Sequence, residues 1–270
     1  MMGADLKLVA TDLDGTLLRD DRRVSARTAD TLARLIDEGT AVALVTGRPV
    51  RWLAQVYEQL RSPVPAVCAN GAVVYDPVRD EVLRAAPLDP ELLGEVARRL
   101  RAEIPGVLLA VEVENGRSLH HDHDWPRRWD AEDTEVRSVT VEELTSAPAV
   151  KLLARAAEQD SDVFVEIVTR SLGGLAEATH SSYSGLVEIS AAGVTKAAGL
   201  AWLCERLGVQ AAQVLAFGDM PNDVPMLAWA GRAVAVDNAH PAVRAVVDDV
   251  TLSNEEDGVA VYLDKLFPAG

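Results

Sequence analysis

The feature of this sequence that most constrains its fold is a series of short apolar runs alternating with segments of helical spacing. Near the N-terminus the runs are residues 6–11, 41–45 and 66–69, and near the C-terminus they are 214–217 and 232–236. Continuous apolar runs of this length are typical of parallel strands that are buried on both faces by helices. The alternation predicts an α/β fold with a Rossmann-like, doubly wound parallel sheet.

Local signals mark the helices between these strands. Ser25 is suited to cap a helix that ends at Gly39, and a second helical pattern covers residues 49–60. Near the C-terminus, the pattern at 195–207 is closed by Gly208. Further helices are expected at 221–230, 240–247 and 256–267.

The middle of the chain lacks this regular alternation of strand and helix patterns and has charged turns and shorter elements. We therefore predict an α+β domain at residues 86–184, inserted into a core formed by residues 1–85 and 185–270. Within the insertion, helices are expected at 90–103 and 161–172, and strands at 107–113 and 150–154.

Charge and composition exclude several classes of function. The chain has 270 residues and a formal net charge of −16, which argues against a nucleic-acid partner. No apolar run is long enough to span a bilayer, and no membrane partner is expected. Cys68 and Cys204 lie in apolar stretches far apart in the sequence, as small buried side chains do, and a cytoplasmic location is expected. An anionic substrate would require a locally positive site in so acidic a chain.

Asp12, Asp14 and Gly15 follow the first apolar run directly, within the segment DLDGT. Ligands of open α/β sheets bind beyond the carboxyl ends of the strands, which is where these carboxylates are expected. Gly15 lets the backbone bend so that both carboxylates can approach one centre, where a cation or a proton must offset their repulsion. An Asp-rich turn without catalytic function is the alternative interpretation.

A second acidic segment, GDMPND at residues 218–223, follows the 214–217 run. Asp219 is expected at the strand end, with Asn222 and Asp223 on the next turn. Such oxygen ligands suit Mg²⁺. Helix capping by Asp219 alone is the simpler interpretation, but two acidic turns at two strand ends favour a metal site.

Two further segments offer groups that bind anions. Thr46 and Gly47 precede Arg48 and Pro49 at the expected start of a helix, where a hydroxyl and backbone N–H groups can receive an anion. Lys196 begins another predicted helix. A plain helix cap and a solvated surface lysine are the alternatives for these segments.

The ordered set DLDGT, TGR, the lysine of GVTK and GDMPND resembles the motifs of the haloacid dehalogenase-like (HAD) superfamily of phosphatases. The insertion resembles the type IIB cap of the Cof-type hydrolases by its position and size. Asn70-Gly71-Ala72 and residues 234–258 also resemble that family, although Asp237 stands where relatives often have glycine. The resemblance implies a Mg²⁺-dependent phosphatase that acts on a small phosphorylated metabolite.

The resemblance also implies a role for each motif residue. Asp12 would be the nucleophile that forms an aspartyl phosphate, and Asp14 the general acid and base. Mg²⁺ would be held by Asp12, the backbone carbonyl of Asp14 and Asp219, with Asp223 in support. The groups implied to bind the phosphoryl oxygens are the backbone N–H of Leu13, together with Thr46, Gly47, Lys196 and Asn222.

Three alternatives accompany this prediction. A phosphomutase or phosphotransferase would keep every motif, and a non-catalytic phosphoacceptor module would store the aspartyl phosphate, although Asp14 argues for turnover. In the inserted domain, the segment His120–Asp124 resembles a metal cluster, since His121 and His123 on one strand face could bind zinc. A polar cap loop that contacts substrate or solvent is the expected role of that segment.

Overall fold

The computed structural model describes residues 6–126, 135–156, 159–180 and 185–268, and the contacts divide the chain into two compact units. The first unit comprises Met1–Arg48, Trp52–Leu83 and Thr195–Gly270, and the second comprises Pro49–Arg51 and Arg84–Val194. The second unit ends at Val194, whereas the inserted domain was predicted to end at residue 184. The difference arises because β11 (Leu186–Ala191) pairs with strands of the second unit.

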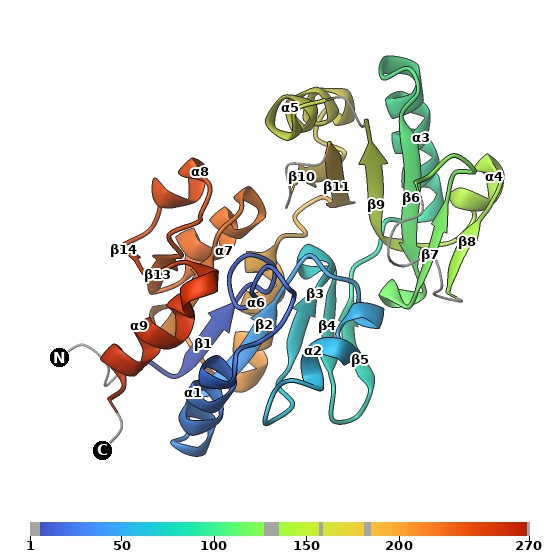
Figure 1. Ribbon diagram of the computed structural model, residues 1–270. Helices are drawn as coiled ribbons and strands as arrows, with labels where there is room; N and C mark the ends of the chain where they lie inside the picture. Colours follow the sequence, from blue (N-terminus) through green and yellow to red (C-terminus); the bar gives the residue numbers. More distant parts are fainter. Residues whose placement is uncertain (1–5, 127–134, 157–158, 181–184, 269–270) are drawn as a thin grey trace. The chain divides into compact units, whose positions relative to one another are not determined.

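An eight-stranded sheet forms the centre of the first unit (Figure 1). Neighbouring strands from β14 through β3 are parallel, and β4 then pairs antiparallel with β3. The strand order is β14 (Asp249–Val250), β13 (Arg232–Ala235), β12 (Val214–Gly218), β1 (Leu8–Thr11), β2 (Ala41–Val45), β3 (Ala66–Cys68), β4 (Val73–Asp76) and β5 (Glu81–Ala85).

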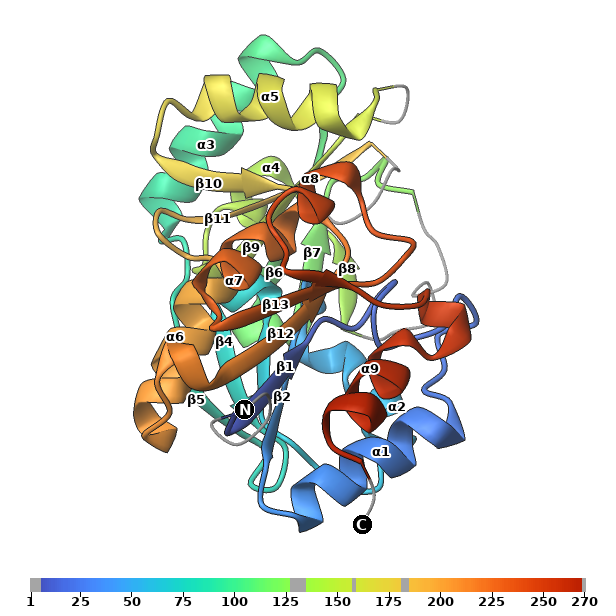
Figure 2. The ribbon, with the colours of Figure 1, turned by 90° about the vertical axis from the view of Figure 1, so that its left-hand side faces the viewer.

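Helices cover both faces of this sheet, as predicted for a doubly wound fold. Figure 2 shows α6 (Lys196–Leu207) and α7 (Val224–Trp229) on one face, and α1 (Ala26–Asp37) and α9 (Gly258–Leu266) on the other. The short helices α2 (Ala54–Tyr57) and α8 (Pro241–Arg244) complete the unit. Because both faces are covered, β1 and β12 are entirely buried.

Local signals place several helix ends correctly. The Ser25 side chain accepts a hydrogen bond from the N–H of Thr28 at the start of α1, and Gly208 ends α6 with a left-handed backbone. The single helix predicted for residues 49–60 is wrong, because the segment contains a 3₁₀ turn at Val50–Trp52 and the short α2. Pro49–Arg51 pack with the second unit, so this segment does not continue as one regular helix.

The second unit is built on a six-stranded sheet, as expected for an α+β insertion. Neighbouring strands are antiparallel except β7 and β8, which are parallel. The order is β10 (Ala176–Thr179), β11, β9 (Ala149–Arg155), β6 (Leu108–Val113), β7 (Ser118–His121) and β8 (Val136–Ser138).

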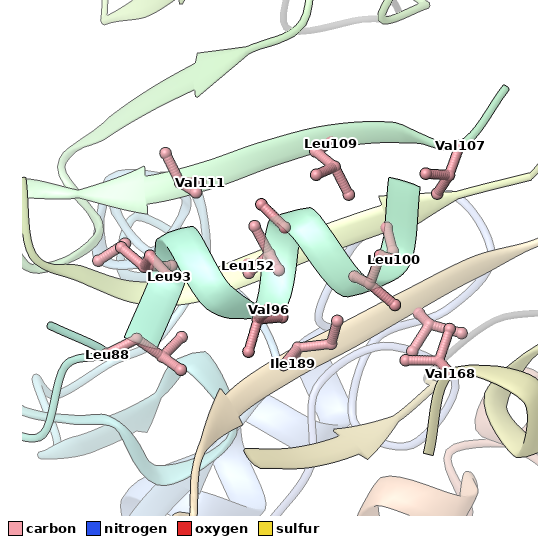
Figure 3. Close-up of a cluster of buried hydrophobic side chains, with 14 of the residues drawn as sticks. Leu88, Leu93, Val96, Leu100, Val107, Leu109, Val111, Leu152, Val168 and Ile189 are labelled. Carbon is pink, nitrogen blue, oxygen red and sulfur yellow. The ribbon is translucent and has the colours of Figure 1, made fainter. Parts of the chain in front are cut away.

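One face of this sheet is covered by α3 (Pro90–Glu103) and α5 (Ser161–Leu172). The short helix α4 (Val141–Leu144) lies between β8 and β9 in the chain. Leu93, Val96 and Leu100 recur at helical spacing and contact the alternating apolar residues of β6 and β9 (Figure 3). Burial of this apolar surface stabilises the insertion as a body with a core of its own.

Buried charges lie on the strands of this unit as well. Lys151 on β9 pairs with Glu188 on β11 at 3.3 Å, and Arg51 pairs with Glu112 on β6. Both carboxylates and Lys151 are buried, so their pairing limits the free-energy cost of burying the charges.

Cys68 on β3 and Cys204 on α6 are buried, as predicted, and no disulfide joins them. None of the described helices is long and apolar enough to cross a membrane.

Candidate active site

The predicted site residues of the first unit gather at the carboxyl ends of adjacent parallel strands. Asp12 follows β1, Thr46 follows β2 and Asp219 follows β12, and the sheet places β12, β1 and β2 side by side. Since parallel strands end at the same edge of a sheet, segments that are far apart in the sequence meet there.

Lys196 lies at the centre of the cluster. It is the first residue of α6, whose N-terminus is capped by the hydroxyl of Thr195. Its ammonium Nζ donates to Oδ1 of Asp12 at 2.6 Å and to Oδ1 of Asp223 at 2.6 Å. Lys196 is only 1% exposed, so the two carboxylates provide the charge compensation that a buried ammonium requires.

Asp223 organises the loop that carries Asp219. Its Oδ2 accepts hydrogen bonds from the backbone N–H groups of Asp219 and Met220, both at 3.0 Å. The Thr16 hydroxyl donates to Oδ1 of Asp219 at 2.8 Å, which links the two acidic loops. Both oxygens of Asp223 thus accept hydrogen bonds, Oδ1 from Lys196 and Oδ2 from the backbone. The carboxylate of Asp219 lies beside the loop that follows β1.

One group of side chains in the described part of the chain could share a metal ion. It consists of the carboxylates of Asp12, Asp219 and Asp223. Their oxygens lie within 4.8 Å of one another. A compact cluster with oxygen as its donor atoms fits Mg²⁺ better than zinc. The residues present therefore fit the metal that the family resemblance implies.

Burial and the neighbouring carboxylates raise the pKa values of Asp12 and Asp219. Burial raises the pKa of Asp12 well above its ordinary value; Lys196 acts in the opposite direction, and neighbouring carboxylates add to the increase. Burial, followed by the charge of Asp223, raises the pKa of Asp219 to about 7. A bound cation would relieve this repulsion directly.

The pKa of Lys196 is shifted so that the charged form is retained. Burial alone would lower the pKa of this ammonium, but the carboxylates of Asp12 and Asp223 outweigh that effect and hold it above its ordinary value. Lys196 is therefore a fixed positive charge beside Asp12, within a cluster that also holds the carboxylates of Asp219 and Asp223.

Gly15 permits the close approach of the two acidic loops. Its φ is +79°, and a Cβ atom at this position would lie 2.4 Å from Oδ2 of Asp219. A side chain would thus both strain the turn and displace a carboxylate of the cluster.

Asp14 lies near the cluster but its side chain is turned toward Arg48. Nε of Arg48 donates to Oδ2 of Asp14 at 2.7 Å, and Nη2 donates to Oδ1 at 2.5 Å. The carboxylate is half exposed, whereas the guanidinium is largely buried. No role was predicted for Arg48 from the sequence, although its place in the TGR segment after a buried strand was an available signal.

Thr46 and its neighbours form a hydrogen-bonded turn after β2. The Thr46 N–H donates to the carbonyl of Val67 at 2.8 Å, and the Thr46 hydroxyl accepts from the N–H of Arg48 at 3.0 Å. Thr46 is fully buried, and Leu13 is fully buried in the neighbouring loop after β1. Gly47 and the backbone of Leu13 thus belong to adjacent loops at the same sheet edge.

Asn222 brings in a partner that the sequence analysis did not assign to the site. Its Nδ2 donates to Oδ1 of Asn70 at 3.2 Å, and both side chains are buried. Asn70 follows β3 and has a left-handed backbone, with φ of 56°. The Asn-Gly dipeptide at a strand end was the signal that could have identified it.

The histidines of the insertion do not form the zinc pair considered from the sequence. His121 is buried at the end of β7, where its Nδ1 contacts the carbonyl of Asp122 at 2.7 Å, whereas His123 is exposed and contacts Asp124. The Asp122 carboxylate binds Arg101 and the N–H of Leu109, which is a structural role.

Comparison with known proteins agrees with this architecture. The haloacid dehalogenase-like hydrolase family matches residues 9–263, and the chain therefore belongs to this family. It is a phosphatase, as its curated relatives are. A 5-amino-6-(5-phospho-D-ribitylamino)uracil phosphatase of Bacillus subtilis is 33% identical over 275 residues, which cover 96% of this chain and 97% of that protein. A phosphoglycolate phosphatase of Methanopyrus kandleri is 32% identical, with 96% of each chain covered.

Solved structures share the fold. A protein from Streptococcus mutans superposes with a TM-score of 0.86 at 21% identity, covering 98% of this chain and 100% of that one. A haloacid dehalogenase-like hydrolase from Bacteroides thetaiotaomicron gives 0.79 at 25% identity, covering 97% and 100%. A subclass IIB sugar phosphatase gives 0.78 at 22% identity, covering 96% and 98%.

Proposed function

We propose that this phosphatase hydrolyses a small phosphate monoester through an aspartyl phosphate formed on Asp12, with Mg²⁺ as its cofactor. The observation that carries the proposal is the buried contact of Lys196 with both Asp12 and Asp223, next to Asp219. A buried carboxylate held between an ammonium and an oxygen-rich metal site is arranged for phosphoryl transfer, which depends on position and charge compensation.

The reaction proceeds in two displacements. In the first, an oxygen of Asp12 attacks phosphorus, the bond from phosphorus to the ester oxygen breaks, and Asp14 gives its proton to that oxygen. In the second, Asp14 takes a proton from water as the water oxygen attacks phosphorus, which releases phosphate and restores the Asp12 carboxylate. The covalent intermediate divides one difficult step into two easier ones.

Mg²⁺ would be held by Asp12, the backbone carbonyl of Asp14 and Asp219. Asp223 would support these ligands without being one of them. The ion supplies charge compensation for the transferred phosphoryl group. Asp223 is suited to its supporting role because its oxygens already bind Lys196 and two backbone N–H groups.

The phosphoryl oxygens would be held by groups from several loops. Lys196 supplies a positive charge, and Asn222 supplies a side-chain amide that Asn70 orients. The backbone N–H of Leu13, together with Thr46 and Gly47, completes the set. These groups are fixed before substrate binds, so little reorganisation is needed in the transition state.

The substrate belongs to the class of small phosphorylated metabolites. Curated relatives act on a phosphorylated ribitylaminouracil, on phosphoglycolate and on pyridoxal phosphate, and this range favours the class over any one member. The inserted second unit is proposed to be the cap that selects among such substrates. A cytoplasmic location belongs to the same proposal, since the two cysteines are buried and form no disulfide.

Phosphate release from a panel of sugar phosphates, nucleotides, pyridoxal phosphate and an aryl phosphate tests the proposal. We expect release that requires Mg²⁺ and stops on chelation. Release that is unaffected by chelation would contradict the metal assignment. Transfer of the phosphoryl group to an added sugar phosphate instead of water would identify a phosphotransferase.

The effect of Mg²⁺ on stability should depend on pH. In the metal-free protein the pKa of Asp219 is raised from 3.8 to about 7, so the stability contributed by this proton is fully present below pH 3.8 and is lost as pH rises through about 7. Mg²⁺ binds the unprotonated carboxylate. We therefore expect Mg²⁺ to raise the melting temperature more at about pH 8 than at about pH 5.5.

Thermal unfolding with Mg²⁺ or with a chelator, at several pH values, measures this difference. Asp219→Asn should abolish most of the Mg²⁺ effect at each pH, and Asp30→Asn, which alters an exposed carboxylate, should leave it intact. An Mg²⁺ effect that stays constant across this pH range would contradict the prediction.

A further inference from the structure

Asp14 and Arg48 occupy equivalent positions on neighbouring parallel strands. Asp14 is the third residue after the end of β1, and Arg48 is the third residue after the end of β2. Because β1 and β2 pair in parallel, their ends lie side by side, and the two loops project from the same edge. The contact of these side chains thus follows from the register of the sheet.

Arg48 is held in place along its whole length. Its N–H donates to the Thr46 hydroxyl at 3.0 Å, its carbonyl accepts from the N–H of Ala69 at 3.0 Å, and its side chain is 10% exposed. Asp14, by contrast, has a side chain that is 52% exposed and is followed by the turn at Gly15. The arginine is therefore the fixed partner of the pair, and the carboxylate takes the orientation that the arginine imposes.

The geometry of the contact selects one orientation of the carboxylate. Two nitrogens of the guanidinium each donate to a different oxygen of Asp14, at 2.5 and 2.7 Å. A planar fork of this kind defines both the position and the plane of a carboxylate, whereas the rounded ammonium of lysine defines only its distance. An exposed aspartate without such a partner would sample several rotamers.

We propose that Arg48 is a positioning residue for Asp14, and that proton transfer between Asp14 and the leaving group depends on this orientation. The inference rests on the proposed function, in which Asp14 protonates the ester oxygen. Arg48 itself exchanges no proton in this role. Arg48 should therefore affect the rate only of steps in which Asp14 transfers a proton. Its effect should vanish when Asp14 can no longer transfer one.

Two substrates with different leaving groups separate this role from a structural one. An alkyl phosphate, such as glycerol phosphate, expels an alkoxide and needs the proton, whereas 4-nitrophenyl phosphate expels a stable anion and does not. We expect Arg48→Ala to lower the single-turnover rate of phosphoenzyme formation about 10- to 100-fold for the alkyl ester and less than about 3-fold for the aryl ester. This step is compared because the later hydrolysis of the phosphoenzyme, in which Asp14 takes a proton from water, is common to both esters. Arg48→Lys should restore part of the loss. Equal losses on the two esters would refute the proposal.

A double-mutant cycle supplies the decisive comparison. In an Asp14→Asn background, Arg48→Ala should lower kcat for the alkyl ester less than about 3-fold further, because the group that it positions is gone. Independent, multiplicative losses would overturn the proposal. So would an increased KM with unchanged kcat, which would show that Arg48 binds substrate directly. Arg61→Ala removes a comparable but exposed pair with Asp30 and should leave both activities unchanged.

A spectroscopic measurement tests the pair without relying on turnover. The arginine Nε–H resonance of Arg48 should be shifted and protected from exchange in the wild-type protein, and both properties should be lost in Asp14→Asn. A resonance that does not change would contradict the pairing. Failure of the phosphatase proposal is recognised separately, by the absence of Asp12-dependent phosphate release from the wild-type protein.

Discussion

Asp12→Asn is expected to lower phosphate release by at least about 10⁴-fold, because an amide oxygen cannot replace the attacking carboxylate. The fold should survive this change. Lys196 keeps its contact with Asp223 at 2.6 Å, and the variant removes a carboxyl group whose pKa burial has already raised. We expect the free energy of unfolding without metal to change by no more than about 1 kcal/mol.

Acid quenching of the enzyme during turnover of a substrate labelled at phosphorus measures the intermediate itself. The wild-type protein should carry label in an acylphosphate that hydroxylamine releases, and the Asp12→Asn variant should carry none. Asp30→Asn changes an exposed carboxylate of the same unit and serves as the matched control, with label and activity retained. Label on the Asp12→Asn variant would place the nucleophile elsewhere.

Lys196→Ala should have the largest effect on stability. It removes the ammonium that lies 2.6 Å from both Asp12 and Asp223, and it leaves two buried carboxylates facing each other without that charge. Breaking a buried ion pair by removing one partner costs about 3–5 kcal/mol of folding free energy. Activity should be lost together with stability, because the same charge is proposed to bind the phosphoryl group.

The loss in Lys196→Ala should depend on conditions in a way that a simple packing defect would not. Acidification protonates the unpaired carboxylates and Mg²⁺ compensates their charge, so each should recover part of the stability. Denaturant unfolding at two pH values, with and without Mg²⁺, measures the recovery. Lys265→Ala, which alters an exposed lysine, is the control and should be close to neutral. A loss that neither acid nor Mg²⁺ reduces would indicate lost packing instead of unpaired charge.

The strands and caps of the first unit were predictable because their signals are local. Buried parallel strands read as apolar runs, as at residues 41–45, and a helix cap depends on one side chain and the next few N–H groups, as at Ser25. The helix predicted at 49–60 failed because three of its residues pack with the second unit. The β4–β5 segment after β3 was not predicted at all.

The candidate site shows the same division. DLDGT, TGR, GVTK and GDMPND could be recognised in order, since each motif is continuous in the sequence. The contacts of Asp14 with Arg48 and of Asn222 with Asn70 could not be predicted, because each joins loops from different strands. Their geometry depends on the register between strands, which no local pattern encodes.

The sequence by itself therefore determined the class of fold, the residues at the strand ends and the family to which the chain belongs. The tertiary structure alone decided which of those residues touch: Lys196 between Asp12 and Asp223, and Arg48 against Asp14. It also placed β11 in the second unit, against the prediction. The physical reason is that hydrophobic periodicity and capping act over a few neighbouring residues, whereas side-chain pairing across a sheet is set by the folding of the whole chain.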